Sequence, residues 1–223
     1  MVIFAIETSG KQGSVALCRG DASSFGLLGL ATLEGGTYSV RLVPCIAELL
    51  RQANVIKSQV DGFVVVDGPG SFTGLRVGLS TVKALCEVLR KPLATVSMLE
   101  ALASVHGCDG EVVTAVLDAG RGEVYSGQYR IAGLAAVSIQ TSMVKLSDFV
   151  SRVTTQSTRV VTTFPKLVAE LGSSAELVAP LGADAIARIG LRKLLAGEVT
   201  DPASLDANYI RRSDAELYAL PKR

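Results

Sequence analysis

Along this chain of 223 residues, short apolar runs alternate with segments whose apolar residues lie three and four positions apart. The runs predict strands and the spaced segments predict helices. Strands are predicted at 2–8, 14–18, within 24–33, 61–67 and 93–96. Apolar residues spaced three and four apart predict helices at 40–53, 71–90 and 98–105. Three strands followed by alternating helices and strands are typical of a mixed sheet with helices on its faces.

The second half of the chain repeats this order of elements without a recognisable sequence repeat. Strands are predicted at 111–118, 123–130, 136–141 and 158–163, and helices at 146–153, 164–172 and 183–196. We therefore expect an α/β protein of two lobes. The first lobe comprises residues 1–103 joined by the C-terminal segment 201–223, and the second comprises residues 104–200.

Composition indicates in which environment the protein works and which kinds of surface it lacks. Hydrophobic residues make up 48% of the chain, but no apolar run approaches the length of a membrane span, and the first six residues lack a basic leader. The four cysteines lie far apart and form no C-x-x-C pair, which fits a reducing cytoplasm. A net charge of +1 predicts no extended nucleic-acid surface.

A glycine-rich loop between the strand at 61–67 and the helix at 71–90 is the most informative motif. A loop that opens a helix can hold an anion, and its contacts would be Gly68, Gly70, Ser71, Gly74 and Arg76. The alternative is architectural, since glycines permit tight turns and close packing. The spacing fits neither a P-loop nor the Gly-x-Gly-x-x-Gly dinucleotide motif.

Two first-lobe helices carry apolar residues on more than one face, which predicts burial on both sides. The second face is covered either by other helices of this chain or by another subunit. For the subunit interface we select the rows Leu42, Ile46, Leu49, Leu75, Leu79, Val82 and Cys86.

Residue types that support catalysis are scarce. His106 is the only histidine, so a multi-histidine metal site cannot form, and no G-x-S-x-G elbow accompanies Ser71. We therefore predict neither catalytic residues nor a metal site, although Glu7 leaves a carboxylate-only site conceivable.

Several of these segments resemble the TsaB (YeaZ) family of the tRNA threonylcarbamoyladenosine pathway. Residues 68–78 resemble the family's glycine signature, and residues 3–9, 118–125 and 209–211 resemble its opening strand, second-lobe hairpin and C-terminal segment. The resemblance is dense over 1–130 and thin from 131 to 208. It implies an actin-like, sugar-kinase and Hsp70-type (ASKHA) fold with two ribonuclease-H-like lobes.

The resemblance also implies a role as a non-catalytic subunit. Such proteins pair through first-lobe helices with a TsaD-like transferase, are joined by a TsaE-like ATPase, and help to modify adenosine 37 of tRNA. The catalytic relative has two metal-binding histidines where this chain has residues 37–44, with Tyr38 nearest. The resemblance implies that the isolated chain binds no cofactor and forms a homodimer. ATP or ADP, and tRNA, would be bound only in the assembled complex.

Three alternatives stay open at the level of sequence. The glycine loop admits an actin-fold ATPase or kinase-like enzyme. An M22-type peptidase is suggested only by an old name in the wider family. Direct tRNA binding would use the basic tail residues Arg211, Arg212, Lys222 and Arg223.

Overall fold

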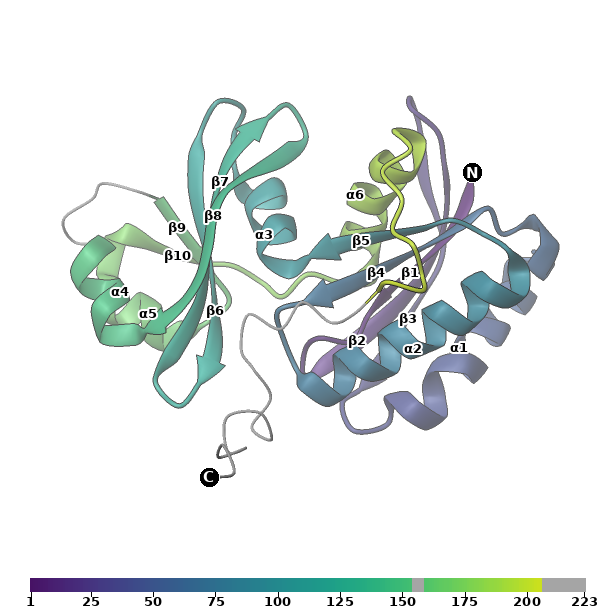
Figure 1. The fold of residues 1–223 in the computed structure, drawn as a ribbon, viewed down its shortest axis with the longest axis horizontal. Helices are drawn as coiled ribbons and strands as arrows, with labels where there is room; N and C mark the ends of the chain where they lie inside the picture. The colour runs from purple at the N-terminus through teal and green to yellow at the C-terminus, as the bar shows by residue number, and fades with distance from the viewer. Residues whose placement is uncertain (154–158, 206–223) are drawn as a thin grey trace, which may run out of the picture.

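The computed structural model describes residues 1–153 and 159–205 and has two lobes, each built on a five-stranded mixed sheet (Figure 1). The order of elements along the chain repeats from one lobe to the other, as the hydrophobic pattern predicts. The residues 209–211 of the family resemblance and the tail residues Arg212, Lys222 and Arg223 lie outside the described residues.

The first sheet has the order β3-β2-β1-β4-β5. Its strands are β1 (Val2–Glu7), β2 (Gln12–Gly20), β3 (Phe25–Glu34), β4 (Gly62–Gly68) and β5 (Leu93–Ser97). The first three are antiparallel neighbours, whereas β1, β4 and β5 run parallel. Every residue of β1 is buried, which explains why its sequence is continuously apolar up to Glu7.

The second sheet has the order β10-β9-β6-β7-β8, which repeats the topology of the first. Its strands are β6 (Val112–Gly120), β7 (Glu123–Ala132), β8 (Ala135–Lys145), β9 (Arg159–Thr162) and β10 (Ala175–Leu177). The meander β6-β7-β8 is antiparallel, and β9 and β10 join it in parallel. The carboxyl ends of β1 and β4, where Glu7 and the glycine loop lie, face the second lobe.

Helices cover both faces of each sheet. On the first sheet, α1 (Tyr38–Gln52) and α2 (Phe72–Leu89) lie side by side on one face and α6 (Ala183–Leu195) lies on the other (Figure 1). On the second sheet, α4 (Leu146–Val153) and α5 (Pro165–Leu171) cover one face and α3 (Met98–His106) covers the other. Single 3-10 turns occur at Lys57–Gln59 and Gly172–Ser174.

Two helices pack across the boundary predicted between the lobes. Helix α3 belongs to the predicted first lobe but packs on β6, β7 and β8, whereas α6 belongs to the predicted second lobe but packs on β1, β2 and β4. Gly190 allows this crossing, because a Cβ there would lie within 3.0 Å of Val64. Helices α3 and α6 thus cross between the lobes. They are joined by an ion pair between Lys193 on α6 and Glu100 on α3, at 2.8 Å.

The element predictions are otherwise confirmed, with ends shifted by a few residues. Strand β10 was missed because it has only three residues, two of them exposed, and so shows no periodicity. The described part of the C-terminal segment does return to the first lobe. Thr200 donates its N–H to Leu93 O at 2.7 Å, and Lys83 Nζ donates to Leu205 O at 2.9 Å. Among the described residues, none of the helices is long and apolar enough to cross a membrane.

Candidate functional site

The glycine loop leaves β4 at Gly68 and opens α2, and it lies directly on the turn that follows β1. Ser71 caps the helix by accepting the Gly74 N–H on its hydroxyl at 3.3 Å. The Ser71 N–H donates to Ser9 O at 2.7 Å, and the Thr8 hydroxyl donates to Gly74 O at 2.8 Å. Two backbone N–H groups of the loop are therefore engaged by the protein itself.

The spacing of these glycines follows from close contact with the same turn. A Cβ on Gly74 would lie within 3.0 Å of Thr8 O, and a Cβ on Gly78 within 3.0 Å of the Thr8 hydroxyl. A Cβ on Gly70 would lie 2.5 Å from Ser9 O. The loop therefore lets the first two turns of α2 lie against the turn that follows β1, which is the architectural interpretation of the motif.

The residues selected as anion contacts are not brought to one point. Gly70, Ser71 and Gly74 line the cleft between the lobes, whereas Gly68 and Arg76 are not among its lining residues. The Arg76 guanidinium instead stacks over the Phe72 ring, 3.8 Å from its centroid, at the exposed start of α2.

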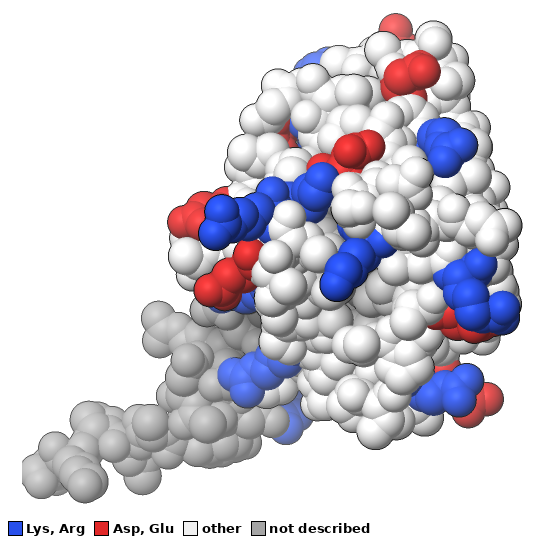
Figure 2. All heavy atoms as spheres, turned by 90° about the vertical axis from the view of Figure 1, so that its right-hand side faces the viewer, with Lys and Arg blue, Asp and Glu red and all other residues white. Residues whose placement is uncertain are grey.

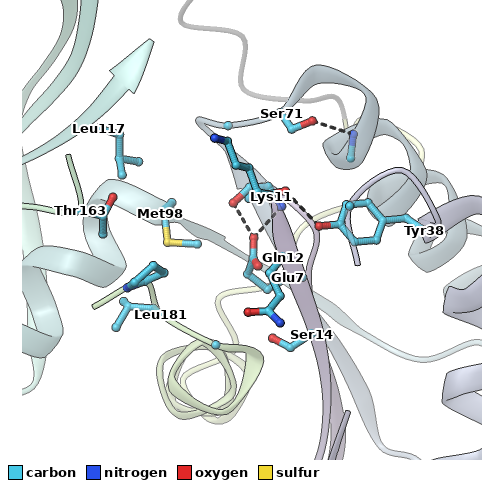
Figure 3. Close-up of a pocket in the computed structure, with 18 of the residues that line it drawn as sticks. Glu7, Lys11, Gln12, Ser14, Tyr38, Ser71, Met98, Leu117, Thr163 and Leu181 are labelled. Atoms are coloured by element: carbon cyan, nitrogen blue, oxygen red, sulfur yellow. Dashed lines mark hydrogen bonds between the residues drawn. The ribbon is translucent and has the colours of Figure 1, made fainter. Parts of the chain in front are cut away.

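A cleft of about 1300 Å³ separates the lobes (Figure 3). Its first-lobe wall is polar and includes Glu7, Lys11 and Ser14, and its second-lobe wall includes Leu117. Met98, at the start of α3, and Leu181, before α6, add apolar surface between the two walls (Figure 3). The cleft is therefore an open groove, and Lys11 is the one cationic side chain among the described residues that line it. It does not surround a phosphate group with positive charge.

Glu7 lines this cleft, and its carboxylate is hydrogen-bonded by groups of the protein itself. Its Oε1 accepts the Ser9 N–H at 2.6 Å and the Ser9 hydroxyl at 2.5 Å. Burial raises the pKa of Glu7 above its ordinary value, although the bonds from Ser9 act in the opposite direction. Tyr38 closes the neighbouring turn by donating its hydroxyl to Gly10 O at 3.0 Å, and burial, with the nearby Glu7 charge, raises the pKa of Tyr38.

A second buried carboxyl, missed by the sequence analysis, lies at the end of β4. Burial raises the pKa of Asp67 to about 6, while nearby Lys193 acts to lower it and Glu100 to raise it. Asp67 Oδ1 is buried without a hydrogen-bond partner among the described residues. Only the crossing of α3 and α6 brings these charges to Asp67, so no local sequence signal indicates them.

The helix rows that the sequence analysis selected as a subunit interface lie in the protein's own core, so these side chains are not available to another subunit. All seven side chains are between 0% and 6% exposed and belong to the first-lobe core: Leu42, Ile46, Leu49, Leu75, Leu79, Val82 and Cys86. The physical reason is that each helix must first bury one apolar row on its own sheet, and these rows are the ones that do so.

A second set of apolar side chains on the same helices is exposed. On α1 these are Val40 (68% exposed), Val43 (56%) and the small Ala47, and on α2 they are Ala84 and Val88 (78%). Figure 2 looks onto this side of the first lobe and shows charged side chains separated by uncharged surface. The sequence contains this second row as well, but its helical spacing does not distinguish it from the buried row.

No metal centre is formed by the described parts of the chain. Residues 1–153 and 159–205 contain no group of three or more His, Cys, Asp and Glu side chains placed to hold an ion. His106 lies at the end of α3, where burial lowers its pKa. Tyr38, at the position nearest to the histidines of the catalytic relative, packs in the core instead.

Comparison with known proteins adds to this picture. A family model described as TsaD, tRNA N6-adenosine threonylcarbamoyltransferase, matches residues 35–175. The tRNA threonylcarbamoyladenosine biosynthesis protein TsaB of Bacillus subtilis is 33% identical over 150 residues, covering 67% of this chain and 64% of that protein. TsaB of Haemophilus influenzae is 34% identical over 133 residues, covering 57% and 53%. The matched region thus spans less than two thirds of either relative.

The fold has a solved counterpart over nearly its whole length. The structure of YeaZ from Pseudomonas aeruginosa superposes with a TM-score of 0.76 at 24% identity, covering 93% of this chain and 99% of that one. Together with the duplicated sheet topology, this confirms the predicted two-lobed, actin-like (ASKHA) fold class.

Proposed function

This chain belongs to the TsaB (YeaZ) family, and from that premise we propose that it is an accessory subunit in the formation of threonylcarbamoyladenosine in tRNA. In this role the chain supplies a binding surface rather than catalytic groups. It docks a TsaD-like transferase, and a TsaE-like ATPase and tRNA join the assembled complex. The proposed site of action is the cytoplasm.

The exposed apolar row of α1 and α2 is the observation that carries this proposal. Val40, Val43 and Val88 are each more than half exposed, although both helices already bury another row in the core. Exposed apolar surface that spans two adjacent helices is typical of a protein-binding face. The docking surface is therefore the exposed row, not the buried row that the sequence analysis selected.

The accessory role is supported by the chemistry of this chain. With one histidine in the sequence, the chain cannot reproduce a two-histidine metal site. Glu7 is hydrogen-bonded by Ser9, and the Ser71 and Gly74 N–H groups of the glycine loop bond to protein atoms. The groups best placed for chemistry thus stabilise the turn between β1 and the loop.

The test is co-expression with a TsaD-like subunit, which shows whether the two chains purify together. Titration calorimetry of the separately purified subunits then measures their affinity. Val43→Glu and Val88→Glu each place a charge on the proposed docking surface, and we expect each to weaken binding at least about tenfold because the charge is buried without a counter-ion. Leu177→Glu is the matched control, since Leu177 is 52% exposed on β10 of the other lobe. Unchanged affinity in both helix variants would overturn the docking surface.

An activity measurement tests the role itself. Threonylcarbamoyladenosine formation by the TsaD-like and TsaE-like subunits should depend on adding this chain, and Val43→Glu should reduce it in step with binding. If the chain modified tRNA without the transferase, the accessory role would be wrong.

One observation favours a second function, because the open cleft of about 1300 Å³ reaches Gly70, Ser71 and Gly74 of the glycine loop. A nucleotide-binding enzyme would use this cleft, with Lys11 as a phosphate contact. Calorimetry of the isolated chain with ATP and Mg²⁺ separates the two functions. Tight binding that Lys11→Ala abolishes would support the enzyme, and no detectable binding at millimolar nucleotide would exclude it for the isolated chain.

A further inference from the structure

The cleft between the lobes has the size and the two kinds of wall that suit a peptide segment. Its volume of about 1300 Å³ exceeds the range of about 300–1000 Å³ that is usual for sites of small ligands. Glu7 and Lys11 lie on the polar first-lobe wall, and Leu117 lies across from them on the second lobe (Figure 3). An extended peptide fits between a polar and an apolar wall, because its successive side chains point to opposite sides.

The chain that follows α6 runs along α2 toward this cleft. Thr200 donates its N–H to the carbonyl oxygen of Leu93, just beyond the C-terminal end of α2, at 2.7 Å. Leu205 O then accepts a hydrogen bond from Lys83 Nζ, farther back along the same helix, at 2.9 Å. The Leu205 side chain is buried in the first-lobe core, so the course of the chain is fixed at both points. From Leu205 this course leads toward the first turn of α2.

Residues 206–223 are long enough to enter the cleft from there. The distance along α2 from Lys83 back to Thr73, which lines the cleft, is ~15 Å at 1.5 Å per residue. An extended chain covers ~3.3 Å per residue, so about five residues bridge that distance. Ile210 therefore reaches the edge of the cleft, and the residues that follow it reach the second-lobe wall.

The cleft offers negative charge next to apolar surface on that wall. Among the described residues that line the cleft, two are acidic, Glu7 and Asp118, and one is basic, Lys11. Asp118 is exposed, and its Oδ1 accepts the Gly120 N–H at 2.8 Å, which orients the carboxylate. Its neighbour on β6 is the half-buried Leu117, so an acidic and an apolar contact lie side by side.

The sequence beyond Leu205 has the complementary pattern. The apolar pair Tyr209–Ile210 stands directly before the basic pair Arg211–Arg212. Charge attraction favours the basic pair beside Asp118, where guanidinium groups can bond to a carboxylate. The apolar pair is then next to Leu117, which removes apolar surface of both from water.

We propose that the C-terminal segment 206–223 occupies the cleft of its own chain as an internal peptide ligand. Its apolar pair packs on Leu117, and its basic pair binds Asp118. The bound segment links the two lobes and excludes other molecules from the cleft, so an external ligand must first displace it. The proposal does not depend on the function proposed above, because the exposed row of α1 and α2 takes no part in it.

Tryptophan fluorescence of the full-length protein tests the proposal. The chain contains no tryptophan, so Ile210→Trp introduces a single fluorophore. We expect its emission to be blue-shifted from that of free N-acetyltryptophanamide, and its acrylamide quenching constant to be about fivefold smaller, because the indole packs on apolar surface. Solvent-like emission and quenching would overturn the proposal.

Cleft variants in the Ile210→Trp protein locate the contact. Leu117→Gln removes apolar surface and Asp118→Lys reverses the charge, and each should raise the quenching constant at least about twofold. Adding Arg211→Asp and Arg212→Asp to Asp118→Lys should restore the low value, because the charges are exchanged. Leu177→Gln is the matched control, since Leu177 is 52% exposed on β10, and it should change nothing. Quenching that ignores both cleft variants would refute the assigned wall.

Two measurements separate an intramolecular contact from other causes. Because the segment is tethered, quenching should stay the same on about hundredfold dilution, and an increase on dilution would mean that the segment binds a second copy, which would overturn the proposal. Hydrogen exchange of the unsubstituted protein avoids the added tryptophan. Ending the chain after Leu205 should speed exchange in the 117–125 hairpin about tenfold and leave α4 unchanged. Equal exchange in the hairpin of both chains would contradict the proposal.

Discussion

The contact between the glycine loop and Thr8 gives a sharp test of the architecture, because two glycines of α2 meet different atoms of one residue. A methyl group on Gly74 would overlap the Thr8 carbonyl oxygen, and a methyl group on Gly78 would overlap the Thr8 hydroxyl. The carbonyl belongs to a backbone held by the Ser71 N–H bond to Ser9 O, whereas the hydroxyl can rotate away. The two substitutions should therefore differ in cost.

The expected magnitudes follow from these contacts. Gly74→Ala forces a backbone shift, and overpacking of this kind costs about 1–3 kcal/mol. In Gly78→Ala the hydroxyl gives up its bond to Gly74 O at a cost of about 1 kcal/mol, which the higher helix propensity of alanine largely offsets, since it contributes about 1 kcal/mol. Gly74→Ala gains the same helix propensity, because Gly74 also lies in α2. We therefore expect Gly74→Ala to lower the free energy of unfolding by about 1 kcal/mol more than Gly78→Ala does, which is the difference between a backbone shift of about 2 kcal/mol and a lost hydrogen bond of about 1 kcal/mol.

Urea denaturation of single and double variants measures these differences. Adding Thr8→Ala should remove the remaining cost of Gly78→Ala, because the clashing hydroxyl is gone, but should not recover Gly74→Ala. Ala84→Gly, at an exposed position of the same helix, calibrates propensity and should cost about 1 kcal/mol. A Gly74→Ala variant as stable as the parent would refute the close packing of α2 on the turn that follows β1.

The remaining predictions concern titratable groups. Because the pKa of Asp67 is raised to about 6 in the fold, from about 4 when unfolded, its contribution to stability declines as pH rises between those values. Asp67→Asn should therefore raise the free energy of unfolding by about 3 kcal/mol at pH 8 and hardly at all at pH 4, and a larger gain at pH 4 would contradict this reasoning. Burial raises the pKa of Cys18 to about 12 and of Cys86 to about 11, whereas Cys108 is exposed. A thiol reagent at pH 8 should accordingly label Cys108 in the native protein and Cys18 and Cys86 only after denaturation, which peptide mass mapping would show.

Hydrophobic periodicity along the chain was sufficient to predict the helices and strands and their order. Strands such as β1 and β4 are apolar on both faces, and the α1 and α2 rows repeat at helical spacing, so local periodicity was sufficient to place them. The glycine motif also indicated close packing before the contact with Thr8 was known. The family resemblance came from the same residues.

Which surfaces are free and which charges lie close together follows only from the three-dimensional packing. Both rows on α1 and α2 have the spacing of a packed helix face, and the position of the sheet alone determines that Leu42 and Leu79 are core and Val43 and Val88 are surface. The exchange of α3 and α6 between lobes, which brings Glu100 and Lys193 close to Asp67, depends on contacts between residues far apart in the chain. Periodicity indicates that a helix has an apolar face, but it does not show whether a sheet, another helix or another subunit covers that face.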